Sequence, residues 1–249
     1  IATMLRAGML PMAYVYPRKM RATRDLLRRR EYFMHQQSEL LTHVKNTNTQ
    51  YNHPAFAKRI AAASNRTGLA DRFVEPSAQK SIEADLHLLD VYHRVLLDLE
   101  SEIKRQAKHH DPVAYHLLQT IPGVGPILAL VILYEVHDIN RFPKVGNFIS
   151  YARLVKCAHE SAGKRSGGGN NKIGNAHLKW AFSEAAVLFL RDQEDAKRLH
   201  QKLISKYGKA KALSIIAQKL GRTVYYMLKK KEPFVAQRFF GDGVHEPAA

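Results

Sequence analysis

The longest regular pattern of apolar positions lies between residues 77 and 110. One face recurs there at alternating steps of three and four residues, with Glu100 as an interruption and no glycine or proline: Ile82, Leu86, Leu89, His93, Leu96 and Ile103. This spacing predicts a long helix in a coiled coil or a helical-hairpin arm. An ordinary core helix is the alternative, although about 34 residues is long for one. Acidic outer positions favour an exposed arm that serves self-association through residues 77–110.

Helical periodicity also marks most of the remaining chain. It predicts a helix from Met20 onwards and short helices at 54–64 and near Ala70. After residue 112 it predicts further helices that include 180–190, 196–206 and 210–230. Alternation of the kind that strands show is nearly absent. The predicted fold class is therefore mainly α.

The charge balance narrows the choice of partners. The chain has 249 residues and a formal net charge of +17, which points to a polyanion: DNA, RNA or an anionic membrane. No run of about 20 apolar residues is present, so no membrane span is predicted. The single cysteine, Cys157, excludes an intramolecular disulfide and is typical of a reducing cytosol. No local feature marks it as an activated nucleophile.

An arginine-rich stretch follows the first helix-breaking residues. Its polar side includes Arg28, Arg29 and Arg30, and only Asp25 and Glu31 offset the charge. Two interpretations stay open for these arginines: contact with nucleic-acid phosphates, or an ordinary solvated helix face.

The stretch 121–126 has the sequence Ile-Pro-Gly-Val-Gly-Pro and precedes an apolar run. This pattern is typical of a helix–hairpin–helix, in which glycines allow a tight turn between two helices. The backbone amides of Gly123, Val124 and Gly125, at the start of the second helix, would then bind a phosphate. Such a contact gives affinity without a choice of base sequence. A plain turn between two helices is the alternative.

The segment 160–175 is rich in Gly, Ser and Asn and carries Lys164, Arg165 and Lys172. A flexible linker is the usual interpretation of such a composition. This segment, however, lies inside a helical region and places cations beside hydroxyl groups. Ser161 and Ser166 are therefore candidate nucleophiles toward a phosphodiester, with cations that stabilise the transition state. Acidic residues are sparse after residue 112, so no metal-dependent nuclease site is predicted there.

Six stretches, taken in chain order, carry a family resemblance: 1–11, 24–30, 121–129, 141–143, 161–163 and 172–179. They resemble the DEDD-type insertion-sequence transposases, the bridge-RNA-guided recombinases of the IS-one-ten/eleven-eleven family. The resemblance implies a RuvC-like domain whose four acidic residues bind Mg²⁺, and a serine that attacks DNA and becomes covalently linked to it. It also implies a structured guide RNA that pairs with target and donor DNA. Ser161 best matches the nucleophile, and Ser166 is the second choice.

The chain departs from the family pattern in three respects. The family's acidic residues lie upstream of the stretch that matches 1–11, so Mg²⁺ is expected only with residues that this sequence does not include. Ser161-Ala162 stands where the family has Ser-Gly, and Leu178-Lys179 stands where it has Leu-Arg. The expectation is an N-terminally truncated transposase that keeps its affinity for DNA or RNA and does not complete recombination alone.

The expected domains are a RuvC-like remnant at 1–76, a coiled-coil arm at 77–112, a transposase domain at 113–238 and a tail at 239–249. The expected function is cleavage and rejoining of DNA through a serine nucleophile with RNA guidance. The expected setting is a dimer or tetramer on the nucleoid, in the cytoplasm of a bacterium or archaeon. The alternative function is a non-catalytic helix–hairpin–helix module that binds nucleic acid.

Overall fold

The computed structural model describes residues 2–10, 13–107, 110–155, 160–161, 164–165 and 173–241. Most of these residues are helical, which confirms the mainly-α class. Strands β1 (Glu160–Ser161) and β2 (Lys164–Arg165) form a short antiparallel pair. The helices, in chain order, are α1 (Ala2–Arg6), α2 (Arg18–Gln50), η1 (Ala63–Asn65), η2 (Ala70–Arg72), α3 (Pro76–Ala107), α4 (Pro112–Gln119), α5 (Pro126–Val136), η3 (Ile139–Arg141), α6 (Val145–Tyr151), α7 (Ala176–Asp192), α8 (Glu194–Tyr207), α9 (Lys209–Lys230) and α10 (Ala236–Phe240).

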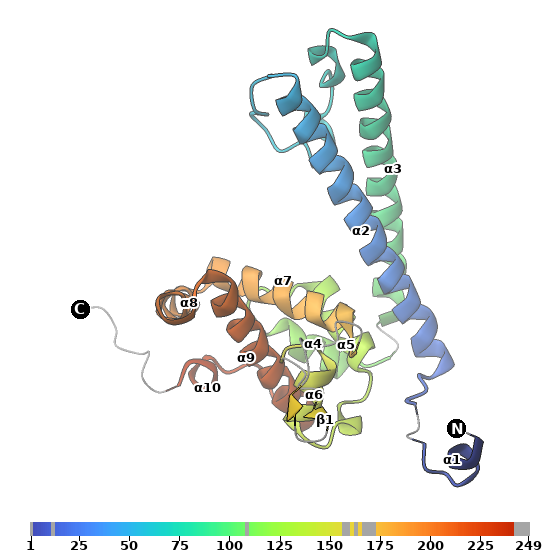
Figure 1. Cartoon of the computed structure of the whole chain (residues 1–249), viewed down its shortest axis with the longest axis vertical. Coiled ribbons are helices and arrows are strands. Elements are labelled where there is room, and N and C mark those ends of the chain that lie inside the picture. Colours follow the sequence, from blue (N-terminus) through green and yellow to red (C-terminus); the bar gives the residue numbers. More distant parts are fainter. Residues whose placement is uncertain are drawn as a thin grey trace.

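The arm is a helical hairpin in which α2 and α3 lie along each other and extend away from the other helices (Figure 1). Fully or nearly buried residues of α3 recur every seven positions, at Ile82, Leu89, Leu96 and Ile103. A seven-residue repeat keeps one stripe of a helix facing its partner. The long helix that the periodicity predicts is therefore present, although His93 is exposed.

The partner of this stripe is α2 of the same chain. The arm therefore comprises residues 18–107, and the apolar stripe that predicted a coiled coil or helical hairpin is covered within the same chain. An oligomer that forms through residues 77–110 would have to use other side chains of α3.

The end of α2 differs from the sequence-based expectation. The helix continues through a run of polar residues because Asn48 is buried and its Nδ2 donates to the carbonyl oxygens of His53 and Pro54. The Asn48 side chain thereby provides hydrogen bonds for two backbone carbonyl groups where the chain turns back. The short helix predicted at 54–64 is absent except for η1 at its end, whereas η2 forms near Ala70 as predicted. Packing explains the difference, since Ile60 reaches the core cluster around Val44 at the far end of the arm.

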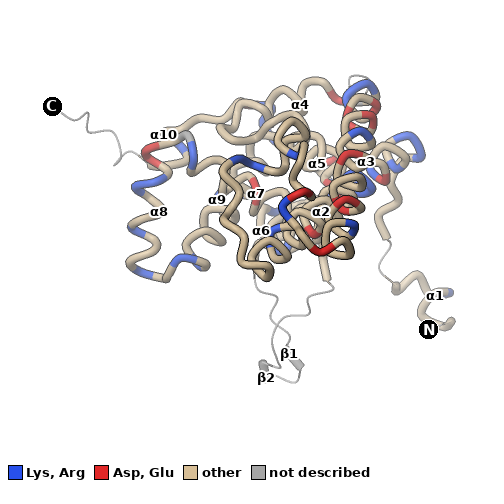
Figure 2. Tube along the Cα trace, turned by 90° about the horizontal axis from the view of Figure 1, so that it is seen from above, with Lys and Arg blue, Asp and Glu red and all other residues tan. Residues whose placement is uncertain are grey.

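The body of the molecule consists of α4 to α10, with α5 at its centre. Every residue of α5 from 128 to 136 is buried, and α7 packs against both α5 and α9. Lys and Arg dominate the charged positions of α8 and α9, and α9 contains no Asp or Glu (Figure 2). None of the described helices combines the length and the hydrophobicity that a membrane span requires.

Candidate functional site

A buried carboxylate, Glu135, lies where α2, α5 and the start of α7 meet. Its residue is 1% exposed, and Arg28 donates from Nε to Oε1 at 2.6 Å and from a terminal nitrogen to Oε2 at 2.8 Å. Asn175 Nδ2 also donates to Oε2, at 2.7 Å. A buried charge requires such partners, and the two-pronged arginine contact is the strongest arrangement of these groups. Glu135 thus joins the arm to the residue that precedes α7.

The start of α7 is held by contacts in three directions. Asn175 Oδ1 accepts from the backbone amide of Leu178 at 3.0 Å and caps the helix. Asn175 Nδ2 also donates to the Tyr151 hydroxyl at 3.2 Å. One turn beyond Arg28 on α2, Glu31 Oε2 lies 2.6 Å from His177 Nδ1.

Two tyrosines and a second arginine extend this network. The Tyr16 hydroxyl donates to the backbone oxygen of Glu135 at 2.7 Å and lies 3.4 Å from the Tyr151 hydroxyl. Arg141 donates to the Tyr16 hydroxyl at 3.1 Å, and its guanidinium lies 4.7 Å from the centroid of the Tyr151 ring. We call this set the Glu135 cluster: Tyr16, Arg28, Glu135, Arg141, Tyr151 and Asn175.

The cluster shifts the pKa values of its members in opposite directions. Burial alone raises the pKa of Glu135, but the hydrogen bonds from Arg28 and Asn175 and the Arg28 charge outweigh burial and hold it below its usual value. Burial likewise raises the pKa of Tyr151, and hydrogen bonds with Tyr16, Asn175 and Arg141 bring it below its usual value. Burial and the hydrogen bond to Tyr151 raise the pKa of Tyr16. Glu135 is therefore charged at neutral pH.

The lowered pKa of Glu135 makes its contribution to stability depend on pH. The contribution is fully present above the unfolded-state pKa of about 4.3 and is lost as the pH falls through that value toward the lower folded-state pKa. Glu135→Gln lacks this titration. We therefore expect the difference in free energy of unfolding between wild type and Glu135→Gln, measured in urea, to shrink between about pH 5 and pH 3. A difference that is constant or grows over this range would contradict the assignment.

The end of α6 and the start of α7 lie side by side, so the chain between them begins and ends at the same place. The backbone N–H of Asn175 donates to the carbonyl oxygen of Tyr151 at 2.6 Å. Arg153 Nε donates to the carbonyl oxygen of Ile173 at 2.8 Å. Gly174 has φ +88°, and a Cβ there would lie 2.7 Å from the Tyr151 oxygen, so glycine is required. Both ends of the connection, which we call the α6–α7 segment, are thus fixed beside the Glu135 cluster.

The first candidate nucleophile lies within the α6–α7 segment. Ser161 ends β1, and its backbone pairs with that of Lys164 in β2, while Glu160 pairs with Arg165. The hairpin therefore places the backbone of two predicted phosphate-binding residues opposite the strand that carries the serine. The side chains of β1 and β2 lie outside the described part of the structure, as do three further residues singled out from the sequence: Cys157, Ser166 and Lys172.

The glycine turn between α4 and α5 has a packing role. Gly123 has φ +81°, and a Cβ at this position would lie 2.6 Å from the backbone nitrogen of Phe189 in α7. Val124 is buried, whereas Gly125 is exposed and precedes the first turn of α5. The close approach of α7 is sufficient to explain why residue 123 is a glycine, and no ligand is needed for that explanation. Phosphate binding by this turn stays a prediction, and Gly125 is its most accessible residue.

The arginine stretch of α2 serves internal contacts at two of its three positions. Arg28 binds Glu135, and Arg30 donates from Nε and a terminal nitrogen to Glu100 Oε1 at 2.9 and 2.7 Å. Arg29 is exposed, and its guanidinium lies 4.9 Å from the Tyr32 ring centroid. Arg28 and Arg30 thus each have a carboxylate partner within the chain, and Arg29 is the most available of the three for phosphate contact.

Neither the buried position of Glu135 nor its contact with Arg28 was predicted from the sequence. A signal was present, because a carboxylate within the apolar run 126–136 needs a buried partner. The asparagine at 175, directly before a helical pattern, was a second signal for a cap. The identity of the partners depends on tertiary packing over more than a hundred residues of chain.

The described side chains do not supply a metal site. Among them, no three His, Cys, Asp or Glu residues gather in a way that could hold a metal ion. Both oxygens of Glu135 are engaged by Arg28 and Asn175. The donor set for Mg²⁺, which needs converging carboxylates, is therefore not found among the described residues.

Comparison with known proteins bears on the same region. Residues 115–201 match the family model described as "Transposase IS116/IS110/IS902 family". The chain is also 30% identical over 141 residues to "Transposase for insertion sequence element IS1111A" of Coxiella burnetii (strain RSA 493 / Nine Mile phase I). This similarity covers 55% of the chain and 38% of the relative, so the chain matches less than half of that protein's length. Residues 115–201, from α4 into α8 and with the α6–α7 segment between them, therefore match the transposase domain of the IS116/IS110/IS902 family.

Proposed function

We propose that the chain acts in DNA transposition and that Ser161 is the nucleophile. The observation that carries the proposal is the fixed base of the α6–α7 segment. This segment lies inside the range that matches the transposase family, it carries Ser161 on β1, and both of its ends are tied beside the Glu135 cluster. A fixed base limits the positions that an attacking residue can reach, and such preorganisation is a main source of catalytic power.

The proposed chemistry is an exchange of phosphate esters. The Ser161 oxygen forms a bond to phosphorus, the bond from phosphorus to a deoxyribose oxygen breaks, and that oxygen takes up a proton. A hydroxyl of another strand then attacks the serine phosphodiester and releases the serine, so the number of phosphodiester bonds is conserved. Lys164, Arg165 and Lys172 are proposed to stabilise the negative charge of the pentavalent transition state.

The proposal includes partners beyond the described residues. A structured guide RNA and a dimer or tetramer are part of it, and so is Mg²⁺ bound by acidic residues of a RuvC-like domain. The net charge of +17 supports a polyanionic partner. The test below therefore uses the natural locus with its flanking DNA, so that these partners are expressed together with the chain.

The test is a search for a covalent protein–DNA adduct. The chain is expressed from its own locus with its natural flanking DNA, and adducts are resolved on a denaturing gel. We expect wild type to give an adduct and Ser161→Ala to give none, since loss of a nucleophile costs on the order of 10⁴-fold or more in rate.

Ser166→Ala is the matched control, because it removes a neighbouring hydroxyl from the same segment. It should retain the adduct. An adduct that persists in Ser161→Ala and disappears in Ser166→Ala would move the role to Ser166. Salt-sensitive DNA binding without an adduct in any variant would favour the non-catalytic binding module instead.

A further inference from the structure

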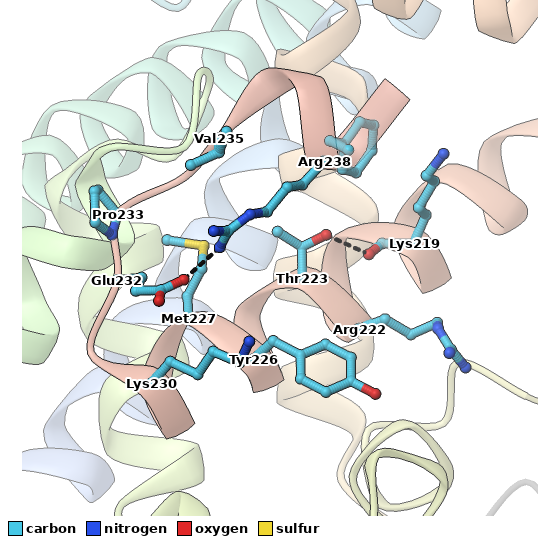
Figure 3. A pocket seen from close by; sticks show the side chains of 11 residues that line it. Lys219, Arg222, Thr223, Tyr226, Met227, Lys230, Glu232, Pro233, Val235 and Arg238 are labelled. Carbon is cyan, nitrogen blue, oxygen red and sulfur yellow. Dashed lines mark hydrogen bonds and ion pairs between the residues drawn. The ribbon is translucent and has the colours of Figure 1, made fainter. Parts of the chain in front are cut away.

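A cavity of about 400 Å³ lies between α9 and the C-terminal segment that leads into α10. Figure 3 shows its lining, with α9 on one side and the residues from Glu232 to Arg238 crossing over it. The volume falls within the range of small-molecule sites. The charged and aromatic side chains that matter below are Lys219, Arg222, Tyr226, Lys230, Glu232 and Arg238.

The side chains that line the cavity carry a net positive charge. Its carboxylate, Glu232, forms an ion pair with Arg238 of the same C-terminal segment (Figure 3). Lys219 and Arg222 form no ion pair among the described residues, and α9 itself offers no acidic neighbour. The Lys219 ammonium lies 4.9 Å from the centroid of the Phe239 ring, and burial lowers its pKa. The cavity therefore favours an anion.

An aromatic ring lies between the cations. Arg222 and Lys230 are four residues before and after Tyr226, so each lies about 6 Å away along the α9 axis. The Tyr226 residue is 46% exposed although its ring borders the cavity. Its neighbour Tyr225 holds it edge-on at 5.3 Å between ring centroids and is itself anchored by a hydrogen bond to Phe142 O. The exposed ring is thus backed by a fixed support.

We propose that this cavity binds one unpaired nucleotide of a polynucleotide strand. The base stacks on Tyr226, and the phosphates on its two sides contact Arg222 and Lys230, with Lys219 deeper in the cavity. Cations that flank an aromatic ring are the usual means of binding single strands without base choice. A paired base is stacked on both faces within a duplex and offers no free face to the ring. The proposal deepens the proposed function, on whose polynucleotide substrate it rests.

The test measures binding of short oligonucleotides to the full chain by fluorescence anisotropy at about 50 mM salt. The probes are a labelled thymidine dodecamer, a uridine dodecamer and a blunt DNA duplex of equal charge. We expect Tyr226→Ala to weaken single-strand binding by about 5- to 100-fold. Tyr226→Phe should retain binding, since the ring remains. Arg222→Ala should lower the slope of log affinity against log salt by about 0.7 for one lost phosphate contact.

The matched controls are Tyr207→Ala and Lys202→Ala, where Lys202 is an exposed residue of α8 that does not line the cavity. Tyr207 is 40% exposed and lies near two lysines, with Lys206 and Lys211 ammonium groups 5.2 and 5.0 Å from its ring centroid, but it does not line the cavity. Both controls should change affinity less than about twofold. Circular dichroism and the midpoint of thermal unfolding verify that each variant folds.

Three outcomes overturn the proposal. The first is absence of single-strand binding by wild type, and the second is equal loss in Tyr226→Ala and Tyr207→Ala. The third is a Tyr226→Ala loss as large for the duplex as for the single strand. Comparison of the affinities for the thymidine and uridine dodecamers shows whether the cavity prefers DNA or RNA. All measurements can be repeated on Ser161→Ala, so a failure of the serine chemistry is distinguishable from a failure of this site.

Discussion

Glu135→Ala is expected to lower the free energy of unfolding by about 3 kcal/mol. The substitution leaves the Arg28 guanidinium and the Asn175 amide without the carboxylate that now accepts from both. The loss should not reach the upper values for buried pairs, because the Arg28 side chain is 36% exposed and can regain water. Urea unfolding followed by the fluorescence of Trp180, the chain's single tryptophan, measures the effect.

Glu83→Ala is the control for the loss of a carboxylate at an exposed ion pair. The side chains of Glu83 and its partner Lys80 are 45% and 81% exposed, so this change should cost less than about 1 kcal/mol. If Glu135→Ala costs no more than Glu83→Ala, the cluster does not hold the arm, the body and the start of α7 together as we describe.

Gly123→Ala is expected to cost about 3 kcal/mol of folding free energy, through two separate effects. At φ +81° an alanine is strained, and its Cβ would lie 2.6 Å from the backbone nitrogen of Phe189 and 2.7 Å from the carbonyl carbon of Leu188. These are main-chain atoms, which cannot rotate away as the end of a side chain can. The expected measurement is a lower urea midpoint with an unchanged slope.

Gly125→Ala in the same turn is the matched control. Its φ is −74°, and no atom lies within 4 Å of a Cβ placed there. Stability should change by less than about 0.5 kcal/mol. The same variant also tests the predicted phosphate grip: weaker DNA binding at unchanged stability would support it, whereas unchanged binding would favour a plain turn.

The helices were predictable because their apolar spacing depends on local geometry alone. The stripe at Ile82, Leu89, Leu96 and Ile103 is visible in the sequence and is buried in the structure. Its partner was not predictable, since the same stripe could face another chain or another segment of its own. Only the packing of α2 decides between these choices.

The candidate site was predictable in part for the same reason. A serine, cations and glycines in one short segment indicate the α6–α7 segment from composition. The side chains that fix its base come from Arg28, Glu135, Tyr151 and Asn175, which are far apart in sequence and meet only in the folded body. Polar contacts of this kind carry no periodic signal. An isolated carboxylate in an apolar helix indicates that a partner exists without identifying it.

The attachment of the arm has a mechanical consequence. From Arg28 to the far end of α2 the helix rises about 30 Å and contains no glycine or proline, so it bends little. Near its other end it is fastened by Arg28 to Glu135 and by Glu31 to His177. A partner that binds the far end of the arm and moves it would therefore exert a torque at Asn175. The arm is a lever whose fulcrum lies at the base of the segment that carries Ser161.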